Sequence, residues 1–334
     1  MDDLAASIDR VAASTRFSGV VRVDRPGREP LVRAHGLAHR GLRVPNAVDT
    51  RFGVASATKG LTALVVASLV EDGALSFSTT ARSLLGDDLP LIDDAVTVEH
   101  LLAHRSGIGD YVDESAGGSA TDYVLPVPVH RLADTEDYLA VLGGFPQVFA
   151  PGERFAYNNG GFVVLALLAE RASGASFRRL VAERVCGPSG MADTAFHRLD
   201  EPAGRMALGY LEAEGLRTNV LHLPVRGSGD GGVLTTAADV AALWRALFAG
   251  RIVPLAVVAE LVRPRSDVPS EKARYGLGFW LHPRTGAVRL EGYDAGVSFR
   301  SVCDPDAGIT HTVLANWTDG AWPIARYLSE RLTP

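Results

Sequence analysis

The sequence has little cysteine and no long apolar run, and each shortage excludes a class of protein. Its two cysteines, Cys186 and Cys303, lie far apart and neither belongs to a Cys-x-x-Cys pair. We therefore expect two buried, reduced thiols and no disulfide framework. The most apolar stretch, residues 61–70, is followed at once by Glu71 and Asp72. It falls short of the roughly 20 residues that a membrane span requires, so no membrane partner is expected.

Positive charge is also limited, and it is not concentrated anywhere. The chain has 33 Lys and Arg residues against 39 Asp and Glu residues, for a formal net charge of -6. The arginines are scattered and form no basic stripe of the kind that binds a phosphate backbone, so nucleic acid is not expected as a partner. The first residues are acidic where a secretory signal is basic, and no apolar segment follows them. This pattern predicts a cytoplasmic protein.

What remains is the composition of an ordinary globular protein. Hydrophobic residues make up 47% of the chain, charged residues 22%, and the mean hydropathy is +0.10. No tract has the composition of a disordered segment. At 334 residues the chain exceeds the most common domain size of about 100 to 150 residues, although one large domain can reach this length. We expect a single domain over residues 1–334 with two closely packed lobes.

Strand-like patterns lie at both ends of the chain and helical patterns lie between them. The sequence predicts a helix at 2–14 and strands at 19–23, 31–37, 277–281, 287–290, 297–302 and 310–315, with a closing helix at 322–332. Helical periodicity appears at 61–69, 98–103, 161–171, 177–184 and 237–248. This order predicts an α+β fold. An antiparallel sheet would combine residues 1–56 and 270–334, a helical lobe would span 57–269, and a cleft would separate the lobes.

The segment Ser56-Ala57-Thr58-Lys59 opens the apolar helix and is a candidate nucleophile with its base. Positions i and i+3 share one face of a helix, so the Lys59 amine can lie beside the Ser56 hydroxyl. A partly desolvated lysine can accept the serine proton, and the helix N-terminus favours a developing oxyanion. A serine N-cap followed by a solvated lysine is the structural alternative. The helix that follows is nearly uncharged and is expected to be buried, so burying the Lys59 ammonium group there without a polar partner would cost free energy.

A second candidate element is Tyr157-x-Asn159, in a loop that enters another apolar helix. The phenol of Tyr157 can carry a proton, and the amide of Asn159 can hold Lys59 or a substrate carbonyl by hydrogen bonds. The same run of Asn and Gly residues is also typical of a turn before a helix, so the motif alone supports both interpretations.

Taken together, the two motifs and their separation resemble the β-lactamase-related serine hydrolases. That family contains class C β-lactamases, D-Ala-D-Ala carboxypeptidases and family VIII carboxylesterases, and further matching segments lie at 98–108, 186–194 and 231–239. The resemblance implies a β-lactamase/transpeptidase-like fold and an acyl-enzyme on Ser56. It also implies that Lys59 and Tyr157 share the base and acid roles, and that Asn159 orients Lys59 or the acyl amide.

The third motif of that family, Lys-Thr-Gly or His-x-Gly on a strand that lines the cleft, is matched incompletely. The best register places it at Leu290-Glu291-Gly292, so Leu290 stands where the family keeps a cation that often meets the substrate carboxylate. Gly292 still permits a close backbone approach. The N–H of Tyr293 would then form the oxyanion hole with the N–H of Ser56.

Other motifs are weaker. Residues 227–232 fit G-x-G-x-x-G, but a dinucleotide site also needs a preceding parallel strand and a later acidic residue, and neither is convincing. His100 and His104 have the i, i+4 spacing of zinc ligands without the accompanying Glu. No metal and no cofactor are expected. The chain also lacks the G-x-S-x-G elbow of α/β-hydrolases.

The preferred interpretation is a serine hydrolase, a carboxylesterase or amide hydrolase that acts on a small acyl substrate. A D-Ala-D-Ala carboxypeptidase or β-lactamase on the same fold is one alternative. An acyltransferase, or a non-catalytic binding protein with this fold, is another. The expected partner is a small ester or amide, and the oligomeric state stays open.

Overall fold

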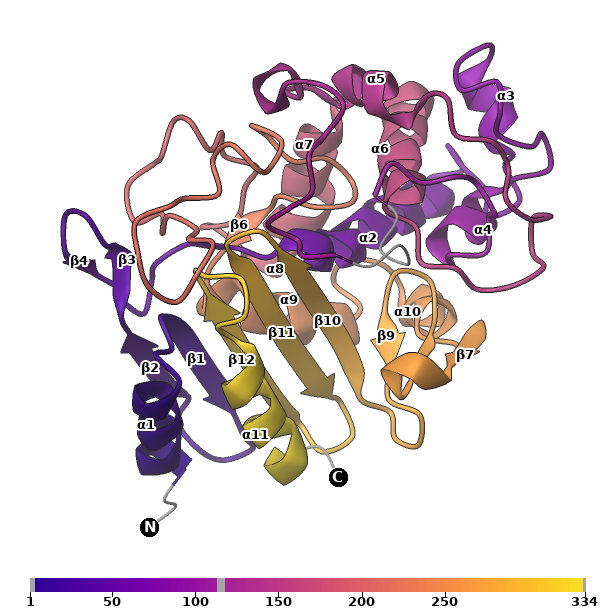
Figure 1. Cartoon of the computed structure of the whole chain (residues 1–334). Helices are drawn as coiled ribbons and strands as arrows, with labels where there is room; N and C mark the ends of the chain where they lie inside the picture. Colours follow the sequence, from indigo (N-terminus) through magenta and orange to yellow (C-terminus); the bar gives the residue numbers. More distant parts are fainter. Residues whose placement is uncertain (1–3, 113–117, 333–334) are drawn as a thin grey trace.

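The two ends of the chain meet in one antiparallel sheet. The computed structural model describes residues 4–112 and 118–332, and within them eight strands pair in the order β2-β1-β12-β11-β10-β9-β8-β7. The N-terminal strand β1 (Gly19–Asp24) lies between β2 (Leu31–His35) and the C-terminal strand β12 (Ile309–Ala315). The predicted sheet of both chain ends is therefore confirmed (Figure 1).

The rest of the sheet continues from β12 toward the helical part of the molecule. Its strands are β11 (Val297–Asp304), β10 (Val288–Asp294), β9 (Trp280–Leu281), β8 (Ala273–Tyr275) and β7 (Ser266–Val268). Two further pairs lie outside it, β3 (Leu37–His39) with β4 (Val44–Pro45) and β5 (Phe52–Gly53) with β6 (Leu234–Thr235).

The strand expected at 277–281 is mostly a turn. Only Trp280 and Leu281 are extended, because Gly278 adopts φ +86° and its N–H donates to the Leu102 carbonyl at 3.1 Å. A backbone of this kind suits glycine and ends a strand. The chain therefore folds back between β8 and β9, which pair at Arg274 with Leu281 and at Tyr275 with Trp280.

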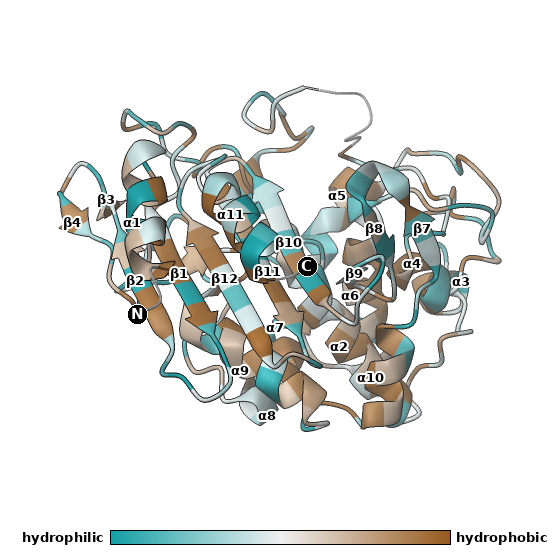
Figure 2. Ribbon diagram, turned by 90° about the horizontal axis from the view of Figure 1, so that it is seen from below, coloured by the Kyte–Doolittle hydropathy of each residue, from teal (hydrophilic) through white to brown (hydrophobic). Residues whose placement is uncertain are grey.

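Helices cover both faces of the sheet. The first and last helices, α1 (Leu4–Ser14) and α11 (Trp322–Leu332), lie together on one face (Figures 1 and 2). Strand alternation sends Val21 and Val313 into the cluster beneath these two helices, whereas Val20 and Leu314 point to the opposite face. Strands β1 and β12 therefore contribute side chains to the hydrophobic clusters on both faces of the sheet.

The opposite face carries the helical part. Its longer helices are α2 (Thr58–Glu71), α6 (Asn159–Ser173), α9 (Ala237–Phe248) and α10 (Leu255–Leu261). Short helical segments are η1 (Ala55–Ala57), α3 (Ala81–Leu85), α4 (Val98–Leu102), η3 (Val129–Arg131), η4 (Thr135–Tyr138), α5 (Leu139–Leu142), α7 (Phe177–Leu180), η5 (Val181–Cys186), α8 (Gly187–Ser189) and η6 (Pro269–Glu271). The helix expected at 177–184 is α7 followed by the π-helical segment η5.

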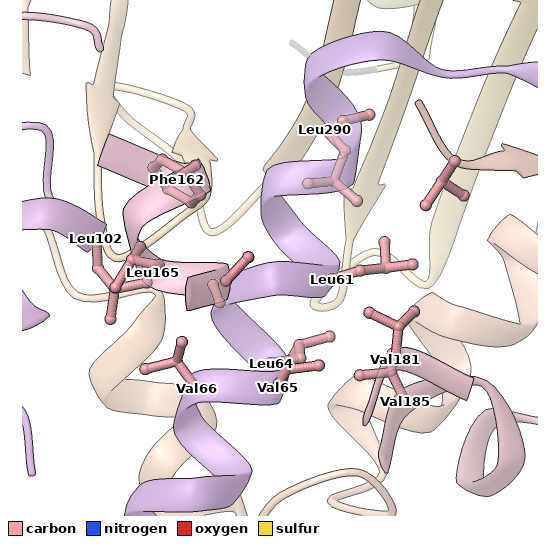
Figure 3. Packing of buried hydrophobic residues seen from close by; sticks show 14 of the residues in the cluster. Leu61, Leu64, Val65, Val66, Leu102, Phe162, Leu165, Val181, Val185 and Leu290 are labelled. Atoms are coloured by element: carbon pink, nitrogen blue, oxygen red, sulfur yellow. The ribbon is translucent and has the colours of Figure 1, made fainter. Parts of the chain in front are cut away.

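Helix α2 is the centre of the main core. Every residue from Thr58 to Leu69 is buried, as expected for a helix that is apolar on all sides. Leu64, Val65 and Val66 pack against side chains from α4, α6 and η5 (Figure 3). The one charged residue in this buried stretch is Lys59, whose exposed fraction is 2%. Such a charge requires close polar partners.

Helix α6 has local signals at both ends that fix where it begins and stops. The Asn158 side chain caps its start by accepting from the Gly161 N–H at 2.6 Å, and Gly174 ends it at φ +71°. Because the cap holds the first turn, the residues around Asn159 have a defined position.

Both cysteines are buried, as predicted. Among the described residues, no single helix is long and apolar enough to cross a membrane; the bent pair Asn159–Ser173 and Phe177–Ser189 passes that test only when taken together.

Leu64→Ala should destabilise the protein by about 2 to 5 kcal/mol, because it leaves a cavity beside fully buried neighbours. Leu42→Ala, at a side chain that is 72% exposed, is the matched control and should change the free energy of unfolding by less than about 0.5 kcal/mol. Urea denaturation measures both. Equal effects from the two variants would contradict the central place given to α2.

Candidate active site

Ser56 lies in a strained turn between a strand and the central helix. It is the middle residue of η1, which joins β5 to α2. The preceding residue, Ala55, has φ +44°, a conformation that residues with a Cβ rarely adopt. Strain of this size persists only where the surroundings enforce it, and such positions cluster at functional sites. The turn presents the Ser56 hydroxyl at the start of α2.

Lys59 lies one turn further along and donates to three oxygen acceptors. Its ammonium nitrogen lies 3.0 Å from Ser56 Oγ, 2.8 Å from Asn159 Oδ1 and 2.9 Å from the Asp230 carbonyl oxygen. These three bonds match the three N–H donors of an ammonium group. The predicted contact between Lys59 and Ser56 is thus present, and the one between Lys59 and Asn159 accompanies it.

Two threonines of α2 fix the loop that supplies the Asp230 carbonyl. Thr62 donates to the Gly229 carbonyl at 2.6 Å, and Thr58 accepts from the Val233 N–H at 3.2 Å. These bonds bracket Asp230 on both sides. Its carbonyl is therefore held toward Lys59 by the same helix that carries Lys59.

Tyr157 is held in a stack of rings beside Lys59. Its ring centroid lies 4.9 Å from the Lys59 nitrogen and 4.3 Å from the ring of His104, and Trp280 stacks on it at 6.2 Å. His104 accepts from the Asn158 N–H through Nδ1 at 3.1 Å. Burial, together with the charge of Lys59, holds the pKa of His104 well below its usual range, so this imidazole is neutral. His104 is therefore a packing partner of Tyr157. His100 has a different role, because it forms the capping box of α4 with Thr97.

Asp110 fixes the backbone of Asn159. Its carboxylate accepts from the N–H of Asn159 at 2.6 Å and from the N–H of Gly160 at 2.9 Å, at the start of α6. Burial raises the pKa of Asp110 to about 6, and these two hydrogen bonds offset part of that increase. Asn159 therefore has its backbone bound to a carboxyl group and its side chain bound to Lys59.

Strand β10 runs past the turn of Ser56. A Cβ on Gly292 would overlap the Val54 carbonyl oxygen and would lie 3.0 Å from the Ser56 nitrogen, so only glycine fits there. Strand β9 pairs with β10 only at Val288 and Arg289, which leaves this edge of β10 beside η1. The side chain of Tyr293 is partly exposed and packs against Trp322.

Leu290 is not brought to the site with the others. It is 3% exposed and belongs to the core, where a Cβ on Gly60 would meet its Cδ2 at 2.5 Å (Figure 3). The expected role of Leu290 in binding or orienting a substrate has no support in this placement. An ammonium group at this position would replace packed methyl groups in the interior.

A cavity of about 330 Å³ opens at Ser56. Asn159 and Tyr293 lie in its wall with Ser56, as the sequence motifs suggest. The remaining described residues of the wall are Tyr111, Val112, Gly118, Ser119, Ala120, Tyr123, Leu125, His222, Leu223, Pro224, Asp230, Gly231 and Asp294.

Three residues of this site were missed by the sequence motifs: Asp110, Tyr111 and Asp230. Tyr111 donates a short hydrogen bond to the carboxylate of Asp230, and burial raises the pKa of both groups. The glycines around Asp230 indicated a tight loop, yet nothing in the sequence showed that this loop faces α2. Asp110 follows the segment at 98–108 and carried no signal of its own.

The comparisons with known proteins agree with the motifs. A family model described as Beta-lactamase matches residues 4–329. Esterase EstB of Burkholderia gladioli is 34% identical over 199 residues, which cover 58% of this chain and 50% of the esterase. D-aminopeptidase of Brucella anthropi is 28% identical over 293 residues, covering 82% of this chain and 51% of that protein. The chain thus spans about half the length of these two relatives.

Solved structures show the same fold. The crystal structure of a penicillin-binding protein from Bacillus halodurans has a TM-score of 0.90 and 33% identity, and the match covers 97% of this chain and 99% of that one. The predicted α+β, β-lactamase/transpeptidase-like fold is confirmed.

Asp110→Asn should change how stability depends on pH. Because the pKa of Asp110 is higher in the folded protein than in the unfolded chain, the folded state binds more protons between about pH 4 and pH 6. Native stability contributed by this group therefore falls as pH rises through that window, on the order of 2 kcal/mol. Chemical denaturation at pH 4 and pH 7 should show a smaller fall for Asp110→Asn than for the unmodified protein, because only the contribution of Asp110 is removed and Asp230, whose pKa is also raised, still titrates.

Asp267→Asn, at an exposed carboxyl group on β7, is the control and should keep the pH profile of the unmodified protein. Parallel profiles for the unmodified protein and Asp110→Asn would show that Asp110 titrates as an ordinary surface carboxyl group.

Proposed function

The chain belongs to the Beta-lactamase family of serine hydrolases, and on that premise we propose that it hydrolyses small esters or amides through an acyl-enzyme on Ser56. The observation that carries the proposal is the hydrogen bond between Lys59 and Ser56 Oγ. The ammonium group that makes it is buried, in a core that is otherwise apolar. The printed names of two relatives, an esterase and a D-aminopeptidase, are consistent with ester or amide cleavage.

The first half of the reaction transfers the acyl group to the enzyme. Ser56 Oγ attacks the scissile carbonyl while its proton passes to the pair formed by Lys59 and Tyr157, one of which is deprotonated at that moment. The tetrahedral intermediate collapses, the bond to the leaving alcohol or amine breaks, and the leaving group takes the proton from the same pair. Ser56 is left as an acyl ester.

The second half reverses these roles with water. A water molecule gives a proton to the pair and attacks the acyl carbonyl, and Ser56 Oγ recovers a proton as the acid product leaves. Asn159 holds Lys59 throughout, which fixes the direction of its N–H groups. The developing oxyanion would accept from the N–H groups of Ser56 and Tyr293, and the close passage of Gly292 beside Ser56 supports this pairing.

A neutral or cationic substrate fits the site better than a carboxylate. Leu290, which the sequence register placed at the cation position of the family's third motif, is buried in the core and contributes no group to the wall of the cavity at Ser56. Among the described residues that line the cavity at Ser56, none is lysine or arginine. This favours esterase or amidase activity over D-Ala-D-Ala carboxypeptidase or β-lactamase activity, because those two substrate classes carry a carboxylate.

Ser56→Ala should lower kcat for p-nitrophenyl butyrate by several orders of magnitude without unfolding the protein, because the covalent route is lost. Lys59→Ala should be nearly as damaging, and the double variant should be little worse than either single one, since both residues serve one relay. Kinetics of the three variants test this. Ser78→Ala, on an exposed turn, is the control. Losses that simply add in free energy would contradict a shared relay.

Tyr157→Phe should reduce kcat/KM by about 10² to 10⁴-fold, because it removes only the hydroxyl and keeps the ring in its stack. Tyr327→Phe deletes a phenol on α11, away from the site, and should leave kcat/KM within about twofold. Circular dichroism checks that both variants fold. A folded Tyr157→Phe protein that loses less than about threefold would assign Tyr157 a packing role only.

A further inference from the structure

A separate cavity lies on the face of the sheet that carries α11. It has a volume of about 160 Å³, and one water molecule needs only about 10 to 15 Å³ of such space. In the register of β10 and β11, Arg289 pairs with Val302, and strand alternation turns both side chains away from the main core that contains Leu290. Helix α11 packs over β11 on that face and contributes Ser329 to the wall (Figure 1). None of the described wall residues belongs to the wall of the cavity at Ser56.

Positive charge reaches this cavity from three segments of the chain. Lys272 precedes β8, Arg289 belongs to β10 and Arg300 belongs to β11, and no Asp or Glu is among the described wall residues. The other wall residues are Ala273, Leu281, His282, Ala287, Val302 and Ser329. A cavity lined by charge of one sign concentrates ions of the opposite sign, so this one attracts an anion.

The two arginines share one carboxylate behind the wall. Arg300 Nε donates a short hydrogen bond to Glu291 Oε2, whereas Arg289 Nε lies 3.9 Å from the same oxygen, too far for a hydrogen bond. The charge of Glu271 also acts on Arg289, but Glu271 is exposed to solvent. Two guanidinium groups around one buried carboxylate leave positive charge that an anion would balance.

Arg289 has buried N–H donors that lack an acceptor. Its Nε and Nη2 are both buried, and neither forms a hydrogen bond with a described residue, while the guanidinium lies 5.3 Å from the centre of the Trp280 ring. Burial lowers the pKa of Arg289; Glu291 offsets part of this decrease and the charge of Arg300 adds to it. Nε and Nη2 share the edge of a guanidinium that binds two oxygens of an anion side by side. Buried donors without an acceptor are rare in folded proteins, and a bound ion is one of their few explanations.

His282 adds a neutral donor to the wall. Burial lowers its pKa, and the charges of Arg284 and Arg289 lower it further, while Asp304 offsets part of the decrease. Its Nδ1 accepts from the Thr285 N–H at 3.1 Å, so the neutral imidazole carries its proton on Nε2. The wall thus combines charged and neutral donors.

We propose that this cavity binds a phosphate group, which Arg289 and Arg300 hold while Lys272 contacts it from the exposed side. A phosphate has oxygens directed to all sides, so it can contact cations from three segments at once. A carboxylate would use one edge of a single guanidinium. The ligand is inorganic phosphate or a phosphate monoester. Because the site lies across the sheet from α2, this inference does not depend on the proposed reaction of Ser56.

Calorimetric titration of the unmodified protein tests the choice of anion. Inorganic phosphate and acetate are compared at pH 8 and constant ionic strength, in a buffer without other oxyanions. Phosphate should bind saturably and at least about tenfold more tightly than acetate, since it gains more than one charge-assisted contact. Phosphate binding that does not saturate, or acetate binding of equal strength, would overturn the proposal.

Variants of the wall locate the bound phosphate. Arg289→Gln should raise the dissociation constant for phosphate by about 10 to 100-fold, the range of a charge-assisted hydrogen bond. Lys272→Gln, at an exposed residue whose replacement leaves the fold intact, should raise it by at least about threefold and decides the matter if Arg289→Gln does not fold. Arg251→Gln removes the same charge from an exposed residue outside the wall and should change it by less than about twofold. Equal phosphate affinity in the wall variants and in Arg251→Gln would overturn the proposal.

Glycerol 3-phosphate distinguishes the two sources of the phosphate group. Tighter binding than that of inorganic phosphate would assign the site to a monoester, and weaker binding would assign it to the inorganic ion. In either case circular dichroism checks folding, and Arg289→Gln should weaken both ligands by a similar factor. A glycerol 3-phosphate affinity that Arg289→Gln and Lys272→Gln leave unchanged would contradict a phosphate site in this cavity.

Discussion

The structure depends on one buried charge. Lys59 lies on a helix that is otherwise apolar on all sides, and its ammonium group is kept there by three oxygen acceptors. These acceptors come from the turn of Ser56, from the start of α6 and from the loop before β6. An unpaired ammonium in this core would cost several kcal/mol, so the three segments must approach each other whenever the protein is folded. The cost of burying one lysine thus fixes the geometry of the site.

The sheet serves the same arrangement from the other side. Strands β1 and β12 join the chain ends, and β10 follows in the sheet with Gly292 against the Ser56 turn. Because α2 packs on the face of this sheet, the proposed nucleophile Ser56 and the backbone that would stabilise the oxyanion belong to two rigid elements (Figure 1). Neither can shift without disturbing the main core. A site held this way suits a reaction in which charge develops at a fixed point.

Much of this was predictable, for physical reasons that differ by residue. Ser56 and Lys59 are three positions apart in a helix, so their contact follows from local geometry, and the strands at both ends follow from periodicity. The burial of Leu290 was not predictable, because strand alternation does not tell which helix covers a face. The contacts of Asp110, Tyr111 and Asp230 join residues that are far apart in the sequence. A single sequence contains no information on which distant residues meet. The lobe boundaries near residues 56 and 270 stay a prediction.

The most direct test of the account is the position of the acyl group during turnover. The protein is mixed with p-nitrophenyl butyrate, the reaction is stopped with acid, and the protein is digested with trypsin. Trypsin cleaves after Arg51 and after Lys59 and so releases the peptide of residues 52–59. Tandem mass spectrometry should find one butyryl group on Ser56 of this peptide, and none after the same treatment of Ser56→Ala. Stable acylation of Lys59 or of another residue, with Ser56 unmodified while substrate is consumed, would contradict the acyl-enzyme mechanism.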